Sequence, residues 1–339
     1  LVDRPGQLCT KLRILGEGID WALAEDAELR AQLARAIGES GVASLAPALR
    51  DWLGDASPRV RFFAAQSLGA LADRESLEPL VALLRENADR DVFLRHAVVF
   101  ALYRLGLPDA LFVHADDPSR AVRLGVLLVL RREGDARIAR FLEDPDPLLV
   151  VEAARAIYDA PIDGAMPALA RLAEGLGAAH EDDLQTAHAL HRRVIGANVR
   201  LRDARGAERL ARYAADARQP ETLRRLALEA LADFASPPPR DLTMGFYRPL
   251  PPVEPTLVAG VFEARGRALL DSSLSARALE IMGGYGASPL DERELVARIR
   301  AQLRRNQVEP SSDTLEVDSA EIRVGTVVLI PDEHRVEVD

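Results

Sequence analysis

Few residues in this chain have the type and the spacing that chemistry requires. His188 and His191 lie three residues apart, hence on one face of a helix, and His180 and Asp183 precede them. Metal-binding helices use such spacing, but the sequence places no third ligand beside the pair. The single cysteine, Cys9, excludes an intramolecular disulfide and any cysteine-cluster site. We expect no metal site, and a small buried hydrophobic residue at Cys9.

Motifs for catalysis or for cofactor binding are also missing from the sequence. It contains no glycine-rich phosphate loop, no nucleophile elbow, no zinc-ligand spacing and no haem-attachment Cys-x-x-Cys-His. Carboxylates are plentiful, but on regularly repeated helices most of them belong to solvent-exposed faces. We therefore predict that the chain has no catalytic residue, binds no cofactor and is not itself an enzyme.

A cluster of positive charge is the first feature that could bind a partner. From His191 to Arg212, seven arginines stand against Asp203 and Glu208. One interpretation is a solvated helix face followed by a turn. The other is a docking patch for an acidic partner, or for the acidic end of this chain. The candidate contact residues of this patch are His191, Arg192, Arg193, Arg200 and Arg202.

A proline-rich segment, residues 236–255, is the second such feature, and we call it the strap. It begins with Ser236 and three prolines and includes Phe246-Tyr247-Arg248-Pro249. Prolines at this density cannot continue a helix and favour an extended path. We predict an ordered segment that lies over the surface of the helical body. Phe246 and Tyr247 are candidate contacts if the segment is instead a partner-binding loop.

The elements that must position these residues repeat along the chain. Residues 55–68 contain a capping Ser57 and Pro58 at a helix start, with Val60, Ala64 and Leu68 on one helical face. The same frame returns at Leu94–Leu102, Asp117–Leu130, Asp144–Ile157, Leu223–Leu231 and Leu274–Met282. Shorter apolar helices are predicted between these copies, at Ser44–Leu53, Leu77–Leu84, Ile138–Leu142, Ala165–Ala173 and Ala207–Tyr213. Each cycle is therefore a helix, a turn and a helix.

This pattern is that of HEAT repeats, and it predicts an all-α fold, an α-solenoid of stacked helix pairs. A single pair cannot bury both of its faces, so the pairs must share one continuous core. We expect an N-terminal lead-in and cap over residues 1–25 and the solenoid over 26–305. The repeat pattern is interrupted at residues 175–205 and again at the strap. In the first interruption a longer helix is predicted to begin at Glu181-Asp182-Asp183 and to continue to Val199.

An arginine recurs at the second position of the frame. The equivalent residues are Arg61, Arg95, Arg123 and Arg224. They are predicted to pair with the turn aspartates of a neighbouring repeat, namely Asp55, Asp117 or Asp144, in what we call the Arg–Asp ladder. The alternative is that the arginines line a groove for an anionic ligand. Each exposed or half-buried pair would contribute about 0–1 kcal/mol and fix the register between repeats.

The charge is unevenly distributed along the chain. The net charge is −10, and residues 306–339 carry nine carboxylates against two arginines. The remaining body is close to neutral, which disfavours binding to nucleic-acid phosphates. No uncharged stretch is long enough to span a membrane. After Asn306 the apolar residues alternate, as in Leu315-Glu-Val317 and Ile322-Arg-Val324, so we expect a short acidic, β-rich tail over 306–339.

Residues 55–250 resemble the HEAT region of large multidomain bacterial dehydrogenases of the planctomycete type. The resemblance is carried by residues 59–69, 146–162, 192–201 and 223–231, and by Phe246-Tyr-Arg-Pro-Leu250. In that family a propeller similar to sorbosone or glucose dehydrogenases precedes this region and is expected to use pyrroloquinoline quinone, and a c-type cytochrome module usually follows. The resemblance implies an exported location. This chain has neither the propeller nor the haem motif, so no catalytic residue carries over.

Three functions remain open from the sequence. The first is a non-catalytic scaffold or spacer within such an exported dehydrogenase–cytochrome assembly, since a chain that begins at Leu1 is expected to be a fragment or a processed form. The second is a free-standing protein- or peptide-binding HEAT module, in which case the location could be cytoplasmic. The third is a HEAT-like DNA glycosylase, which would need a basic groove and a catalytic aspartate. The partner and the oligomeric state stay undetermined.

Overall fold

The structure is a computed structural model that describes residues 26–178, 186–291, 293–294, 296–297 and 300, and three strands between 322 and 338. The chain divides into two compact units, Leu1–Ala165 (unit 1) and Met166–Asp339 (unit 2). The predicted lead-in over 1–25, Cys9 within it, and the segment Glu181-Asp182-Asp183 lie outside the described residues. The predicted division of the chain at residues 25 and 305 stays a prediction.

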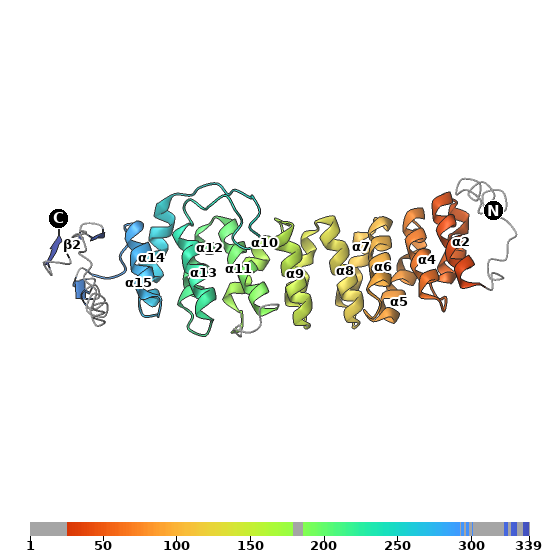
Figure 1. The fold of residues 1–339 in the computed structure, drawn as a ribbon, viewed down its shortest axis with the longest axis horizontal. Helices are drawn as coiled ribbons and strands as arrows, with labels where there is room; N and C mark the ends of the chain where they lie inside the picture. The colour runs from red at the N-terminus through yellow and green to blue at the C-terminus, as the bar shows by residue number, and fades with distance from the viewer. Residues whose placement is uncertain are drawn as a thin grey trace, which may run out of the picture. The chain divides into compact units, whose positions relative to one another are not determined.

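Unit 1 is built of helix pairs (Figure 1, red to yellow). Its longer helices are α2 (Ala27–Ser40), α4 (Pro58–Leu71), α6 (Val92–Leu105), α8 (Arg120–Glu133) and α9 (Pro147–Asp159). Shorter helices follow them: η2 and α3 (Ala43–Leu45, Ala46–Trp52), η3 and α5 (Arg74–Ser76, Leu77–Asn87), α7 and η4 (Pro108–Phe112, Val113–Asp116), and η5 (Ala136–Glu143). The predicted alternation of helix, turn and helix is confirmed in this unit, although Ile138–Leu142 is 3₁₀-helical rather than α-helical.

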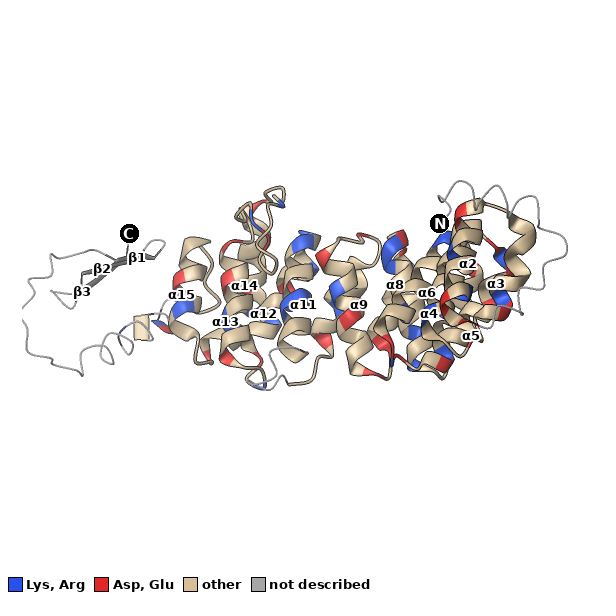
Figure 2. Ribbon diagram, turned by 45° about the vertical axis from the view of Figure 1, so that its right-hand side comes forward, with Lys and Arg blue, Asp and Glu red and all other residues tan. Residues whose placement is uncertain are grey.

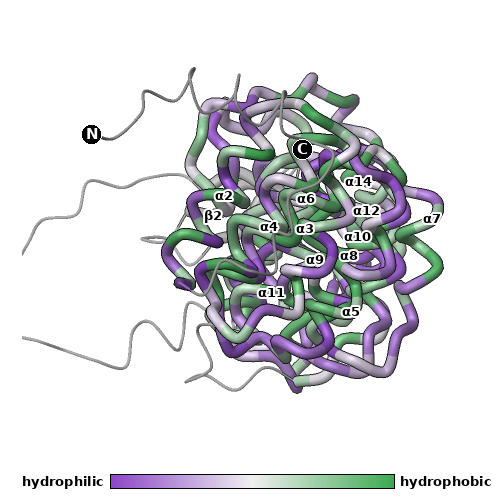
Figure 3. Tube along the Cα trace, turned by 90° about the vertical axis from the view of Figure 1, so that its right-hand side faces the viewer, coloured by the Kyte–Doolittle hydropathy of each residue, from purple (hydrophilic) through white to green (hydrophobic). Residues whose placement is uncertain are grey.

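The longer helices of unit 1 pack side by side, α2 on α4, α4 on α6 and α6 on α8. Val60, Ala64 and Leu68, predicted to share one face of α4, are all fully buried. Small residues permit the close approach, because a Cβ added at Gly69 would lie 2.6 Å from the Cα of Ala101. Apolar (green) and polar (purple) stretches alternate along the chain trace (Figure 3), as amphipathic helices require.

Unit 2 contains helices and a long irregular segment (Figure 1, green to blue). The helices are α10 and η6 (Met166–Arg171, Leu172–Glu174), α11 (Ala187–Leu201), α12 (Ala204–Ala215), α13 (Glu221–Ala232), α14 (Pro255–Leu270) and α15 (Ser275–Gly284). Helices α11 to α15 share one apolar core, in which Leu210, Leu228 and Phe262 are buried. Between α13 and α14 the strap contains no helix, and α14 begins at its last residue, Pro255. The helices from α2 to α15 fit an α-solenoid.

Three short strands are described near the end of the chain. They are β1 (Ile322–Val324), β2 (Val327–Ile330) and β3 (Arg335–Val338), joined as an antiparallel sheet in the order β1-β2-β3. Arg323 is opposite Val328, and Val328 is opposite Glu337. Most of the segment 306–339 lies outside the described residues, so the β-rich tail predicted there stays a prediction.

Helix starts in unit 1 use a repeated aspartate turn. Ser57 occupies the N-cap of α4 and Pro58 follows it, as predicted, but the Ser57 side chain makes no capping hydrogen bond. Asp55 instead accepts a hydrogen bond from the backbone N–H of Ser57 at 2.7 Å. Asp117 and Asp144 do the same for the N–H groups two residues on. The prediction for the Ser57 side chain was wrong because the aspartate two residues earlier holds the turn.

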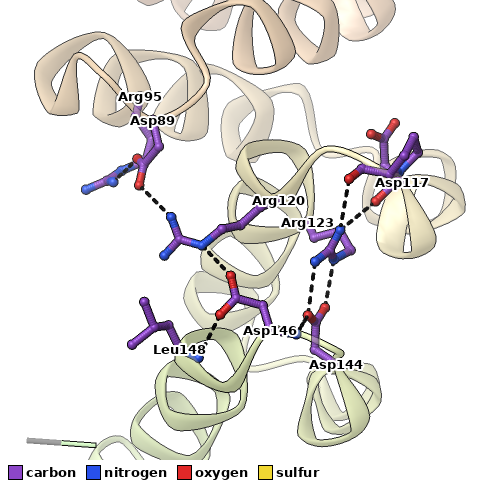
Figure 4. A network of polar contacts seen from close by, with 9 residues as sticks. Asp89, Arg95, Asp117, Arg120, Arg123, Asp144, Asp146 and Leu148 are labelled. Atoms are coloured by element: carbon purple, nitrogen blue, oxygen red, sulfur yellow. Dashed lines mark hydrogen bonds and ion pairs between the residues drawn. The ribbon is translucent and has the colours of Figure 1, made fainter.

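The Arg–Asp ladder is confirmed at Arg123. Its Nε and Nη2 donate to the two carboxylate oxygens of Asp144, at 2.8 and 3.1 Å, and Nη1 donates to the backbone oxygen of Asp117 (Figure 4). Both side chains are largely buried. The hydrogen bond from Arg123 to Asp144 and the nearby carboxylates outweigh the cost of burial and raise the pKa of Arg123.

A second Arg–Asp pair of the ladder, which we call a rung, involves a residue that the sequence analysis missed. Arg30 donates from Nε and Nη2 to Asp55, at 2.7 and 3.2 Å. Burial opposes ionisation of Asp55, but these bonds and the N–H of Ser57 hold the pKa of the Asp55 carboxyl below its usual value. Arg30 stands four residues after the N-cap of its helix, as Arg123 does. Helix α2 is thus an additional copy of the frame.

The other predicted rungs differ from the prediction. Asp117 pairs with Arg85, at 2.7 Å, and not with an arginine of the frame. Arg95 pairs with Asp89 of its own repeat, and Arg224 donates to the backbone oxygen of Ala214. For Arg95 the reason is that Arg85 already occupies the Asp117 carboxylate, and other cations outside the frame also reach turn carboxylates. Figure 4 shows one of them, Arg120, which lies between Asp89 and Asp146.

Candidate interaction site

The strap of unit 2 is an ordered segment that closes into a small hairpin. Asp241 donates its N–H to the oxygen of Phe246 at 2.8 Å, and Arg248 donates its N–H to the oxygen of Pro239 at 2.9 Å. A single antiparallel bridge joins Arg240 to Tyr247. Gly245 closes the turn with a φ of +68°, a conformation in which a side chain would be strained. Residues 239–248 therefore form a hydrogen-bonded hairpin, and the extent of the predicted strap over 236–255 stays a prediction.

Asp241 is the anchor of this hairpin. Its Oδ1 accepts hydrogen bonds from the N–H groups of Thr243, at 3.0 Å, and Met244, at 2.7 Å. Its Oδ2 lies 3.4 Å from Nη1 of Arg200, and the Asp241 side chain is only 2% exposed. A carboxylate that accepts backbone N–H groups and faces a guanidinium is fixed in place. Asp241 therefore ties the tip of the strap to helix α11.

Two further arginines of the predicted patch also hold the strap. Arg202 donates from Nε to the oxygen of Pro251 at 3.0 Å and from Nη2 to that of Ala235 at 3.4 Å. Its guanidinium carbon lies 4.8 Å from the centre of the Phe234 ring, within range of a cation–π interaction. Arg193 approaches the sulfur of Met244 at 3.9 Å. Arg200, Arg202 and Arg193 thus have partners within this chain.

Arg192 contributes to the strap by its backbone and leaves its side chain exposed. Its carbonyl oxygen accepts a hydrogen bond from the hydroxyl of Thr243 at 3.2 Å, while the residue as a whole is exposed. Beside it a pocket of about 320 Å³ is lined by His188, Arg192 and Arg225 among others. Of the five basic residues predicted to dock a partner, Arg192 is the exposed one.

His191 lies inside unit 2 and does not reach a partner from there. It is 3% exposed, and its Nδ1 lies 2.6 Å from the hydroxyl of Tyr213, which is also buried. Burial, with a smaller contribution from His188, lowers the pKa of His191 to about 4. Burial also raises the pKa of Tyr213. The helical spacing of His191 with Val194, Ile195 and Asn198, all buried, is the signal that could have indicated this position.

The aromatic residues of the strap are the exposed part of the site. Phe246 is 54% exposed and Tyr247 is 74% exposed. The guanidinium carbon of Arg248 lies 5.3 Å from the centre of the Phe246 ring, and Leu242 at the tip is 36% exposed. These side chains stand on a backbone that Asp241 and Arg202 hold. The arrangement displays two large rings on a hydrogen-bonded hairpin.

Sites for metals and membranes do not appear in the described residues. No group of three or more His, Cys, Asp or Glu residues lies close enough there to hold a metal ion. None of the helices in the described ranges is both long and apolar enough to cross a bilayer. Arginines and carboxylates are interspersed along the helices of both units (Figure 2).

Comparisons with known proteins support the repeat and leave the function open. Residues 19–103 match the family model for HEAT repeats, which confirms the repeat type predicted from the sequence. No curated protein matches the chain.

Two solved structures that match the chain have low sequence identity to it. Human deoxyhypusine hydroxylase in complex with glycerol is 22% identical over 67% of this chain and 88% of its own, with a TM-score of 0.28. An engineered protein is 17% identical over 92% of this chain and 86% of its own, with a TM-score of 0.35. The comparisons lend no support to a dehydrogenase assembly or to a DNA glycosylase.

Proposed function

We propose that this chain is a non-catalytic protein-interaction scaffold in which the strap presents Phe246 and Tyr247 to a protein partner. The observation that carries the proposal is the exposure of these two rings on a hairpin held by Asp241 and Arg202. HEAT repeats suit such a role, because stacked helix pairs create extended surfaces. The strap supplies a specific contact that the regular repeats do not.

The physical argument rests on preorganisation. Aromatic and arginine side chains provide most of the binding energy at many protein interfaces. A side chain that is already positioned loses less conformational entropy on binding, which is worth about 0.5–1.5 kcal/mol for each immobilised side chain. Phe246, with Arg248 against its ring, meets both conditions, and the backbone of Tyr247 is held by its bridge to Arg240. Singly exposed hydrophobic residues are common on proteins, so the rigid support is the decisive feature.

A narrower proposal concerns the protein context. The strap residues Phe246-Tyr-Arg-Pro-Leu250 belong to the stretch that resembles the HEAT region of exported multidomain dehydrogenases. In that context the chain would be a spacer, and the partner of the strap would be a neighbouring domain of the same assembly. In the alternative, a free-standing module, the partner would be a separate protein or peptide. The sequence that surrounds this chain in its gene distinguishes the two.

Site-specific photo-crosslinking tests the proposal. We expect p-benzoylphenylalanine at position 247 to give a discrete adduct with one protein in extract from the source organism. The matched control is the same residue at Val113, which is 79% exposed in unit 1. Equal adducts from both positions, or none from position 247, would contradict the proposal.

Binding to the crosslinked partner then gives the energetic test. Phe246→Ala with Tyr247→Ala should weaken the Kd at least tenfold, since central aromatic contacts are worth about 2 kcal/mol or more. Tm should stay unchanged, because both rings are exposed. Val113→Ala should leave the Kd unaltered. A double variant that binds like the wild type would show that the rings are not the contact.

A further inference from the structure

Unit 1 contains a pocket of about 410 Å³ where the starts of α4 and α6 meet the end of α5. Two arginines, Arg61 and Arg90, line it together with the apolar side chains Leu83 and Leu94. The carboxylates of Glu86 and Asp91 also line it, so an anionic ligand needs a cation whose donors these two carboxylates leave unsatisfied.

The Arg–Asp ladder shows what an arginine at this position binds. Arg30 and Arg123 stand four residues after their N-caps, and each donates Nε and Nη2 to both oxygens of one aspartate. Arg61 occupies the same helical position in α4. Its Nε, however, is buried without a hydrogen-bond partner among the described residues. Its Nη1 lies 3.6 Å from Glu86, which is 62% exposed.

The expected partner of Arg61 is occupied elsewhere. The turn before α6 offers Asp89, but Asp89 pairs with Arg95 and lies 3.4 Å from Arg120. Asp91, which also lines the pocket, accepts hydrogen bonds from the N–H groups of Phe93 and Leu94 as the cap of α6. Arg61 therefore stands where the arginine of an Arg–Asp pair belongs, but both nearby aspartates are engaged elsewhere.

We infer that this pocket binds a carboxylate from outside the chain, which takes the place of the aspartate in the rung at Arg61. Paired donors of a guanidinium bind a carboxylate with two parallel hydrogen bonds. A buried donor without an acceptor is unfavourable, and such binding supplies the acceptor. Because Nε is shielded in the present rotamer, binding includes a rotation of the guanidinium from Glu86 toward the pocket. The inference is independent of the strap.

Arg90 supports the same ligand. Its Nε and Nη2 donate to the backbone oxygens of Asn87 and Glu86, at 3.2 and 2.8 Å, which fixes the guanidinium beside the pocket. Leu83 and Leu94 can contact the methylene groups of the ligand. The acid could be a small free dicarboxylic acid or a glutamate side chain of another protein, and both sources share this chemistry.

Titrations of the full chain, followed by NMR of the arginine Nε–Hε groups, test the inference. One probe is glutarate, and the other is an acetylated and amidated peptide with a single glutamate. We expect the Arg61 signal to shift saturably while the Arg123 signal stays in place, since Arg123 already holds Asp144. Tighter binding of the peptide assigns the site to a protein side chain, and equal or tighter binding of glutarate assigns it to a free acid. No saturable shift with either probe overturns the inference.

Three variants separate this site from general charge effects and from an internal ligand. Arg61→Gln should reduce the affinity at least tenfold, whereas Arg59→Gln, on the same helix and 58% exposed, should leave it within twofold. Equal losses would mean attraction to surface charge only. Glu86→Gln should tighten binding severalfold, because it removes the competing carboxylate. A lower Tm without tighter binding would show that Glu86 itself completes the rung, which overturns the inference.

Discussion

The two units use arginine in different ways. In unit 1 the buried rungs Arg30–Asp55 and Arg123–Asp144 connect the start of one helix to the turn before another. In unit 2 the arginines of α11 and of its end, Arg200 and Arg202, hold an irregular loop. Where the frame is regular, its charges fix the register of the repeats. Where the repeat pattern is interrupted in unit 2, arginine side chains position an irregular segment that can contact a partner.

Removal of a buried rung should give the largest loss of stability. Asp144→Ala leaves Arg123 without its carboxylate and the N–H of Asp146 without its acceptor. The unfolding free energy of unit 1 should fall by about 3–5 kcal/mol, as for other broken buried pairs. Urea unfolding followed by tryptophan fluorescence measures it, because Trp52 is buried in this unit.

The matched control for the rung is Glu152→Ala. Glu152 pairs with Arg131 at 3.1 Å, but the Arg131 side chain is 39% exposed, and such pairs contribute about 1 kcal/mol or less. If both variants lose the same stability, the distinction between buried rungs and surface pairs is wrong.

Unit 2 should respond to acid through His191. The folded pKa of about 4 lies below the ordinary value of 6.5, so the unfolded state binds the proton more readily. The stabilisation is complete above pH 6.5 and is lost as the pH falls from 6.5 toward 4. The loss amounts to about 3 kcal/mol at pH 4. Urea unfolding at several pH values, followed by circular dichroism, measures this change.

His191→Gln is the reference for the acid response. The variant stays neutral, so its stability should fall less between pH 6.5 and pH 4 than that of the wild type. Parallel pH profiles of the two proteins would show that His191 is not the titrating group.

Removal of the carboxylate that anchors the strap should cause a smaller loss of overall stability. Asp241→Ala removes the acceptor for Thr243 and Met244 and leaves Arg200 without this carboxylate. We expect a loss of about 2 kcal/mol together with faster proteolysis between residues 242 and 248. Asp216→Ala is the control, since Asp216 pairs with an exposed Arg218 away from the strap. Unchanged proteolysis in Asp241→Ala would contradict the role of Asp241 as the anchor.

The sequence predicted the repeats well because their periodicity is local. The face of Val60, Ala64 and Leu68, and the pair Arg123–Asp144, follow from spacing along the helices. For the other arginines, the aspartate that each one contacts depends on competition among neighbouring cations, as at Asp89. Spacing along the chain does not predict the outcome of that competition.

The interaction site was predictable in part. Proline density indicated an ordered strap with Phe246 and Tyr247, and both rings are exposed. The role of Asp241 was missed, although an aspartate shortly before Gly245 is typical of a turn. The basic cluster was interpreted by charge alone, which does not distinguish an exposed arginine from one such as Arg202 that serves its own chain. That the basic cluster contacts a partner stays a prediction. His191 is buried and is therefore no longer a candidate contact.

Hydrogen–deuterium exchange at the strap tests the central claim most directly, because the proposed contact depends on a hairpin that is fixed before any partner binds. The amides of Asp241, Gly245 and Arg248 donate hydrogen bonds within the hairpin. We predict that all three exchange much more slowly than in an unstructured peptide, and that Asp241→Ala removes this protection while the helices of unit 2 keep theirs. Exchange in the wild type at the rate of an unstructured peptide would contradict the account.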